Sequence, residues 1–381
     1  MSTIPLDYET LRLIWWLLLG VLLIGFAIMG GRDLGVGTLL PFAARTDAER
    51  RVLLNLIGPT WEGNQVWLIL GGGAIFAAFP PLYAVSFSGF YLAMLVILLA
   101  LILRPVGFKF RGKVEDKRWR TAWDWGLFIG GFVPALNMGV AVGNVLLGAP
   151  FHLDHTMRIF YTGNFFQLLT PFALLAGLVS VGMVVTHGAA LLAGRTEGII
   201  AERARRYGIW AGLATIALFA LGGAWISFMN GHVITSVIDP NAPINPLSKS
   251  VELVPGGWLS NYGTYPWMIA APVLGFAGMA LAVFGLAARR KWLAYLASST
   301  GIFGIVSTAG LSIFPFFLPS STVPNSGLTL WDSSSSHMTL FIMLLVTAFF
   351  LPIIVMYTGW VFRVMRGPVT SDSLGKNPNA Y

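Results

Sequence analysis

Apolar side chains dominate long runs of this chain, and short clusters of polar and charged residues separate the runs. A helix needs about 20 apolar residues to cross the hydrocarbon core of a bilayer. Runs of that length predict membrane-spanning helices, because a helix satisfies its own backbone hydrogen bonds. The predicted spans cover residues 11–29, 52–79, 82–103, 122–147, 165–188, 209–228, 268–288, 293–318 and 339–362. The pattern predicts an all-α, polytopic membrane protein with nine transmembrane helices, forming one integral membrane domain over residues 1–381.

The composition excludes an ordinary soluble domain. Hydrophobic residues make up 56% of the chain and charged residues only 10%, whereas a soluble domain carries roughly 25% charged residues. The chain has no cysteine, so it forms no disulfide and supplies no thiolate ligand to a metal or an iron–sulfur cluster. Its net charge of +8 would suggest nucleic acid binding in a soluble protein, but in a membrane protein it reflects topology.

The basic residues alternate along the chain in the way that membrane topology predicts. The segments 30–51, 104–121, 189–208, 289–292 and 363–381 contain 4, 7, 4, 3 and 3 of the 24 lysines and arginines. The segments on the other side, 80–81, 148–164, 229–267 and 319–338, contain 0, 1, 1 and 0. Because basic residues accumulate on the cytoplasmic side, we expect the N-terminus outside, an exoplasmic loop at 229–267 and a cytoplasmic tail at 363–381.

One predicted span carries polar residues. The stretch "PTWEGNQVWLILGGGAIFAAFP", residues 59–80, sets Glu62, Asn64 and Gln65 among apolar side chains. Counted from Val52 at about 1.5 Å per residue, Glu62 would lie near mid-membrane, where a carboxylate facing lipid costs roughly 2.5–3.5 kcal/mol. We therefore expect it to face protein or water. Two interpretations stay open: a proton relay, and a network of hydrogen bonds that holds helices together.

The histidines do not form a pattern typical of a metal or haem site. They are His152, His155, His187, His232 and His337. The spans place His187 at the cytoplasmic end of a helix and the others in exoplasmic loops, whereas an axial haem ligand would be central in a helix. His152 and His155 flank Asp154, but no further ligand follows nearby, so we interpret this trio as a solvated loop.

Five long blocks carry a family likeness, and they occur in the family's order. They are "LRLIWWLLLGVLLIGFA", "WEGNQVWLILGGGAIFAAFP", "SFSGFYLAMLVILLALILRPVGFKFRGK", "YTGNFFQLLTPFALLAGLVSVGM" and "IFPFFLPSSTVPNSGLTLWDSSSS". Together they resemble subunit II of the cytochrome bd-type quinol oxidases. The likeness extends along the chain to Tyr381.

The resemblance implies two four-helix bundles plus one extra helix, in a bacterial cytoplasmic (inner) membrane. It implies a complex that oxidises ubiquinol and reduces oxygen to water. In this family subunit I, the partner in a heterodimer, ligates two b-type haems and one d-type haem. Subunit II supports that haem-bearing subunit and contributes to paths for protons and oxygen. Quinone and membrane lipid are further implied contacts, and a small single-helix subunit is left open.

The block "WEGNQVW" resembles the family's W-D-G-N-Q-V-W, with Glu62 at the acidic position. The resemblance implies that Glu62, Asn64 and Gln65 offer protons a polar route. It also implies that Trp67 lies near a route by which oxygen enters.

Two other blocks depart from the family pattern. The family's D-G-F-D after the first span reads "GGRD" here, so Gly30 replaces an acid and Asp33 remains as a candidate for the proton path. The block "RPVGFKFR" carries Lys109 where some members have an acid. A cation at that cytoplasmic mouth would repel protons rather than collect them.

A proton-coupled secondary transporter is the alternative function. A mid-membrane carboxylate in a broken helix suits a transporter, although the sequence shows no strong internal repeat. A purified sample with a second membrane subunit and haem absorption favours the oxidase. A colourless single-chain preparation favours the transporter.

Overall fold

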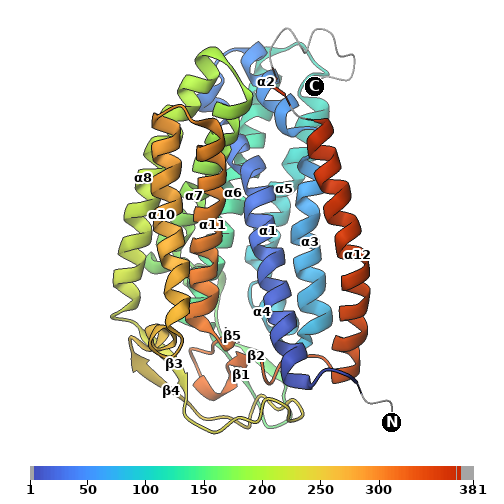
Figure 1. Cartoon of the computed structure of the whole chain (residues 1–381), viewed down its shortest axis with the longest axis vertical. Helices are drawn as coiled ribbons and strands as arrows, with labels where there is room; N and C mark the ends of the chain where they lie inside the picture. Colours follow the sequence, from blue (N-terminus) through green and yellow to red (C-terminus); the bar gives the residue numbers. More distant parts are fainter. Residues whose placement is uncertain (1–3, 366, 370–381) are drawn as a thin grey trace.

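The computed structural model describes residues 4–365 and 367–369, and it is a bundle of long helices with small hairpins at one end (Figure 1). The long helices are α1 (Tyr8–Ala43), α3 (Trp61–Ala78), α5 (Tyr91–Phe110), α6 (Lys117–Leu147), α7 (Pro171–Arg195), α8 (Gly198–Ile226), α10 (Ala270–Ala287), α11 (Lys291–Ile313) and α12 (His337–Val364). The short ones are α2 (Asp47–Ile57), α4 (Pro80–Gly89), α9 (Ser260–Thr264), η1 (Phe165–Leu168), η2 (Gly257–Leu259), η3 (Pro266–Ile269) and η4 (Pro324–Ser326). The strands are β1 (Phe151–Leu153), β2 (Ile159–Tyr161), β3 (Asn230–Ile234), β4 (Val251–Pro255), β5 (Phe316–Leu318) and β6 (Leu328–Thr329).

The predicted all-α membrane fold is confirmed, but the count of nine spans stays a prediction. Within the described residues, eight helices are long and apolar enough to cross a bilayer. Helix α3 is not among them, because polar Glu62, Asn64 and Gln65 fall in its first two turns. It nevertheless packs along α1. Most of the predicted tail 363–381 lies outside the described residues.

The predicted span 52–79 is wrong as a single helix. Helix α2 ends at Ile57, a turn follows, and α3 begins at Trp61. Pro59 lacks a backbone N–H and clashes with the preceding turn, so it ends the first helix here. Glu62 therefore lies in the first turn of α3 and not within a continuous helix that starts at Val52. The predicted span 82–103 is likewise divided, into α4 and α5 at Phe90.

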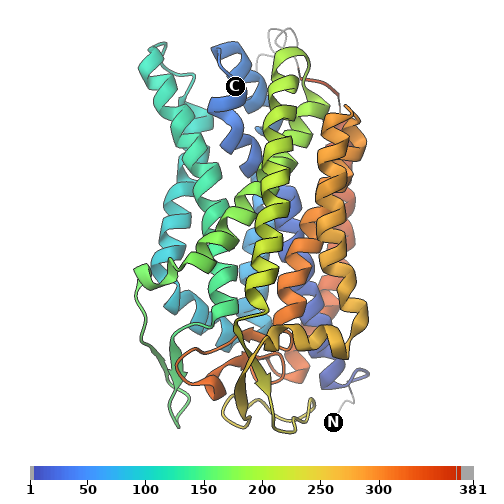
Figure 2. The same ribbon diagram turned by 90° about the vertical axis from the view of Figure 1, so that its left-hand side faces the viewer.

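The long helices form two groups. Helices α3, α1, α6 and α5 pack in that order in the first group, and α7, α8, α10 and α11 pack around one another in the second. Helices α1 and α6 also pack on α7 and so join the two groups, and α12 lies beside α1 (Figures 1 and 2). This arrangement agrees with the predicted pair of bundles and an additional helix.

Helices α1 and α7 approach each other through glycines. A Cβ atom on Gly35 would lie 1.9 Å from the carbonyl oxygen of Val184, and one on Gly188 would lie 2.6 Å from the backbone of Gly35. Real side chains cannot occupy those positions. Small residues at helix crossings let backbones come close in membranes, so these glycines set the distance between the two groups.

Three antiparallel hairpins, β1–β2, β3–β4 and β5–β6, cover the end of the bundle where α1 begins. We call these hairpins and segment 314–336 the cap. Part of the segment is buried, and Phe316, Leu318, Leu328 and Leu330 are at most 1% exposed. The predicted exoplasmic loop 229–267 supplies β3 and β4. Helix α12 ends at the opposite end of the bundle (Figure 1).

Candidate functional site

A buried carboxylate–amide pair links α1 to α3. The Asn64 side-chain amide donates a hydrogen bond of 2.6 Å to Asp33 Oδ2. Asp33 is 1% exposed and Asn64 is 3% exposed. The turn after α2 places Asn64 on the face of α3 that packs on α1, so the broken helix creates this contact. Two of the residues predicted from the sequence therefore meet.

Two arginines complete a buried polar cluster around Asp33. Arg32 Nε lies 3.7 Å from Asp33 Oδ1. Arg104 on α5 is 4% exposed, interacts electrostatically with Asp33 and lies 5.2 Å from the centroid of the Trp61 ring. We call Arg32, Asp33, Asn64 and Arg104 the α1 polar cluster. It contains two cations and one anion.

Several atoms of this cluster have no hydrogen-bond partner within the described part of the chain. They are Asp33 Oδ1, Arg32 Nε, Arg32 Nη2 and Arg104 Nη2. A buried unsatisfied polar group costs about 1–3 kcal/mol, and more when it is charged. Native proteins tolerate that cost mainly where the group has a function or binds water. Asp33 Oδ1 is thus an acceptor available to a proton or a water molecule.

The other predicted residues of α3 do not join the cluster. Glu62 is exposed on the outside of this chain, and Gln65 is partly exposed. Trp67 packs across α1, where a Cβ on Gly25 would lie 2.6 Å from its ring. Glu62 therefore points away from the rest of this chain, two residues along from the buried Asn64.

The sequence reasoning missed Arg32 and Arg104 as site residues. Both were counted among the cytoplasmic basic residues, in segments 30–51 and 104–121. Helix α1 continues to Ala43 and α5 continues to Phe110, so both arginines lie inside long helices. An arginine within a few residues of an apolar run was the signal that could have indicated them.

His187 lies deeper in its helix than predicted. The predicted span ended at residue 188, but α7 continues to Arg195, about two turns further. The ring is fully buried. Its Nδ1 lies 2.7 Å from Ser298 Oγ and its Nε2 lies 3.1 Å from the Ile28 carbonyl oxygen. Both nitrogens have protein partners, so His187 does not fit the role of an axial haem ligand.

The remaining histidines lie in the cap or, for His337, at the start of α12 beside it. His232 is 5% exposed and its Nε2 lies 2.9 Å from the Ser320 carbonyl oxygen. His337 Nε2 contacts the Leu6 carbonyl oxygen. Asp154, between His152 and His155, accepts hydrogen bonds from its own loop. Among the described residues, no three His, Cys, Asp or Glu side chains are grouped to hold a metal ion.

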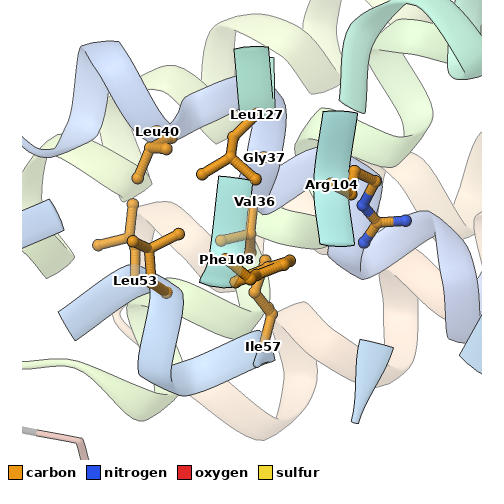
Figure 3. A pocket seen from close by; sticks show the side chains of 9 residues that line it. Val36, Gly37, Leu40, Leu53, Ile57, Arg104, Phe108 and Leu127 are labelled. Carbon is orange, nitrogen blue, oxygen red and sulfur yellow. The ribbon is translucent and has the colours of Figure 1, made fainter. Parts of the chain in front are cut away.

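A small cavity lies next to the cluster, between α1, α2, α5 and α6 (Figure 3). Its volume is about 10 Å³, which is about the minimum that holds one water molecule. Figure 3 shows the Arg104 guanidinium turned away from Leu40 and Leu53, so the lining is apolar. This cavity has no room for a cofactor.

The fold and the site together define a class: an integral membrane helical bundle with a buried polar cluster. Comparisons with known proteins make this class specific. Residues 11–365 match the family model described as cytochrome bd terminal oxidase subunit II. The chain belongs to this family, and it is a subunit of a bd-type terminal oxidase, an oxidoreductase.

Relatives cover nearly the whole chain. It is 49% identical over 376 residues to cytochrome bd-I ubiquinol oxidase subunit 2 of Escherichia coli, covering 98% of this chain and 99% of the relative. It is 30% identical over 372 residues to cytochrome bd ubiquinol oxidase subunit 2 of Bacillus subtilis, with coverage of 97% and 98%. These relatives identify an integral protein of a bacterial inner membrane that works with a partner subunit. They give no support to the alternative of a proton-coupled transporter.

A solved structure supports the fold. A chain of the bd oxidase from Geobacillus thermodenitrificans superposes with a TM-score of 0.69 at 18% identity, covering 93% of this chain and 98% of the other.

Proposed function

We propose that this chain is the supporting subunit of a heterodimer whose subunit I ligates two b-type haems and one d-type haem and takes ubiquinol as substrate. Both ring nitrogens of His187 already contact protein atoms, which supports haem ligation by the partner subunit. Helix α12 supports it as well, because Leu340 is its only buried residue among those described. A helix so weakly covered by its own chain suits contact with another subunit, with lipid or with a small single-helix subunit.

The proposal includes an orientation. The cap end is exoplasmic, and the end where α12 finishes is cytoplasmic. The distribution of basic residues supports this assignment. Helix α1 begins at the cap and α12 ends at the other end of the bundle (Figure 1), which agrees with a first helix and a last helix that begin and end on opposite sides.

We also propose that the first turns of α3 carry protons inward from the cytoplasmic end. Glu62 takes up a proton at the outer surface of this chain, Gln65 and Asn64 offer hydrogen bonds along the way, and Asp33 is the buried acceptor. The buried Asn64–Asp33 hydrogen bond is the observation that carries this proposal. Trp67, packed against Gly25, is the proposed residue beside the oxygen route.

The substitutions Glu62→Gln and Glu62→Asp test the proton route. Glutamine keeps the size of the side chain but releases no proton, so we expect turnover of the assembled oxidase to fall about tenfold or more. Aspartate keeps the proton, so most activity should remain. Turnover is measured on purified complex whose haem content is determined from its absorption spectrum.

A matched control is Glu252→Gln, which changes an exposed carboxylate in the cap and should leave turnover unchanged. Equal, near-normal rates for Glu62→Gln and Glu62→Asp would make Glu62 a structural residue. Low haem content in Glu62→Gln alone would assign it to assembly.

A further inference from the structure

Arg32 is held by side chains of two other helices, and a third helix supports one of them. Its Nη1 donates a hydrogen bond of 3.3 Å to the Tyr295 hydroxyl on α11. Its guanidinium lies 4.2 Å from the centroid of the Phe362 ring on α12. The Tyr295 ring stacks on His187 of α7 at 4.8 Å. Arg32 is 6% exposed, so this cation is fixed in place and largely shielded from water.

The Arg32 guanidinium lies close to Asp33 but does not form a hydrogen bond with it. The distance of 3.7 Å between Arg32 Nε and Asp33 Oδ1 exceeds hydrogen-bond length, and both atoms lack a partner among the described residues. A positive charge at that distance favours the ionised carboxylate, and low-dielectric surroundings strengthen the effect. The lone pairs of Oδ1 nevertheless stay available to a proton.

We propose that Arg32 is a positioning residue for Asp33: clamped by Tyr295 and Phe362, it favours the ionised form of the carboxylate over the protonated form and leaves Oδ1 open as the proton acceptor. The proposal rests on the proton route above and adds to it the group that prepares Asp33 for the next proton. Tyr295 and Phe362 act through Arg32 and do not touch the carboxylate themselves.

Few other charged or titratable groups lie near Asp33 or Arg32. Within the described residues, the groups that face Asp33 or Arg32 from the packed helices are Arg104 on α5, uncharged Asn64 on α3, Tyr295 on α11, and His187 and Arg195 on α7. Glu62 is exposed and outside this set. Arg104 remains when Arg32 is changed, so the effect of Arg32 should be partial rather than complete.

The experiment follows the protonation of Asp33 by infrared difference spectroscopy of the purified complex. The carboxyl C=O band that disappears in Asp33→Asn is assigned to protonated Asp33. The band is titrated with pH in the wild type and in Arg32→Met, Arg32→Lys and Tyr295→Phe. Arg205→Met removes one cation that pairs with Glu202 at the surface and is the matched control.

We expect Arg32→Met to move the midpoint of the band to higher pH by about one unit or more, because an adjacent opposite charge typically shifts a carboxyl by 1–3 units. Tyr295→Phe should move it in the same direction by less, since Arg32 keeps its charge but loses an anchor. Arg32→Lys should restore most of the wild-type behaviour. Arg205→Met should leave the midpoint unchanged.

Turnover measured against pH separates this inference from the proton route. If Arg32→Met moves the band but Asp33→Asn turns over normally, Arg32 sets the charge of Asp33 while the proposed route fails. If Asp33→Asn is slow and Arg32→Met titrates like the wild type, the route stands and the role of Arg32 is overturned. If Arg32→Met does not assemble, Tyr295→Phe decides: an unmoved midpoint overturns the inference.

Discussion

Arg12 shows how a charge can be held inside the cap end of the bundle. It is 0% exposed. Its guanidinium donates to Ser334 Oγ and to the carbonyl oxygens of Pro240 and Ala242 and lies 3.6 Å from the centroid of the Tyr8 ring. An arginine whose donors all have acceptors in the protein need not reach water.

His232 makes the cap sensitive to acid. Burial lowers the pKa of His232 below its usual value, and the hydrogen bond to the Ser320 carbonyl only partly opposes this shift. The unfolded chain takes up a proton as the pH falls through about 6.5, whereas the folded imidazole stays neutral until the pH reaches its lower pKa. The stability that depends on this residue is therefore complete above pH about 6.5 and is lost as the pH falls from there to the folded pKa, below which no more is lost.

We predict that His232→Gln reduces this acid sensitivity. Glutamine can still donate to Ser320 but does not ionise. Between neutral pH and pH about 5, the melting temperature of the wild-type complex should fall more than that of the variant, by roughly 2–4 °C for each unit of pKa shift. His155→Gln alters an exposed histidine and should match the wild type. Equal acid sensitivity of His232→Gln and the wild type would contradict the prediction.

At the scale of elements, apolar run length predicted the helices better than it predicted their ends. The length of an apolar run predicts a helix because a helix in lipid needs apolar side chains. Helices α1 and α5, however, continue past their apolar runs into basic sequence. The break at Gly58–Thr60 was visible only as Pro59, which is also compatible with a kinked continuous helix. Because of this break, Glu62 lies at the start of α3 and not inside a longer helix.

The candidate site was predictable only in part for the same reason. Sequence spacing identified Asn64 as polar within an apolar run, and the family likeness indicated Asp33. Their contact depends on how α3 packs on α1, and spacing within one helix carries no information about the neighbouring helix. Arg32 and Arg104 join the site through helix length and packing, and both were assigned to the cytoplasmic surface instead.

The glycine crossing of α1 and α7 gives a test at this scale. Gly35→Ala places a Cβ 1.9 Å from the Val184 carbonyl oxygen, and such overpacking costs about 1–3 kcal/mol or more. We expect less assembled, haem-containing complex in membranes. Gly20→Ala is the matched control, because nothing lies within 4 Å of its Cβ and alanine favours helix by about 1 kcal/mol. Equal assembly of both variants would contradict the role of the crossing.

At the scale of the whole molecule, the proposed function depends on which end of the bundle faces the cytoplasm. Helix α1 begins at the cap and α12 ends at the opposite end of the bundle (Figure 1), so we expect the chain to cross the membrane an odd number of times. A reporter that is active only outside the cytoplasm should be silent when fused after Tyr381. The same reporter inserted at Ala242, in the cap loop, should be active. The reverse result would invert the proposed orientation and place Glu62 toward the exoplasmic side of the membrane.

The central claim is that this chain supports an oxidase whose haems are held by its partner. The absorption spectrum of the complex purified through a tag on this chain tests it most directly, with and without His187→Gln. Glutamine replaces the buried imidazole of α7 and can form hydrogen bonds in its place. The account predicts a second large subunit, the bands of b-type and d-type haem, and the same spectrum in both samples. A colourless single chain, or the loss of one haem band from an assembled His187→Gln complex, would contradict it.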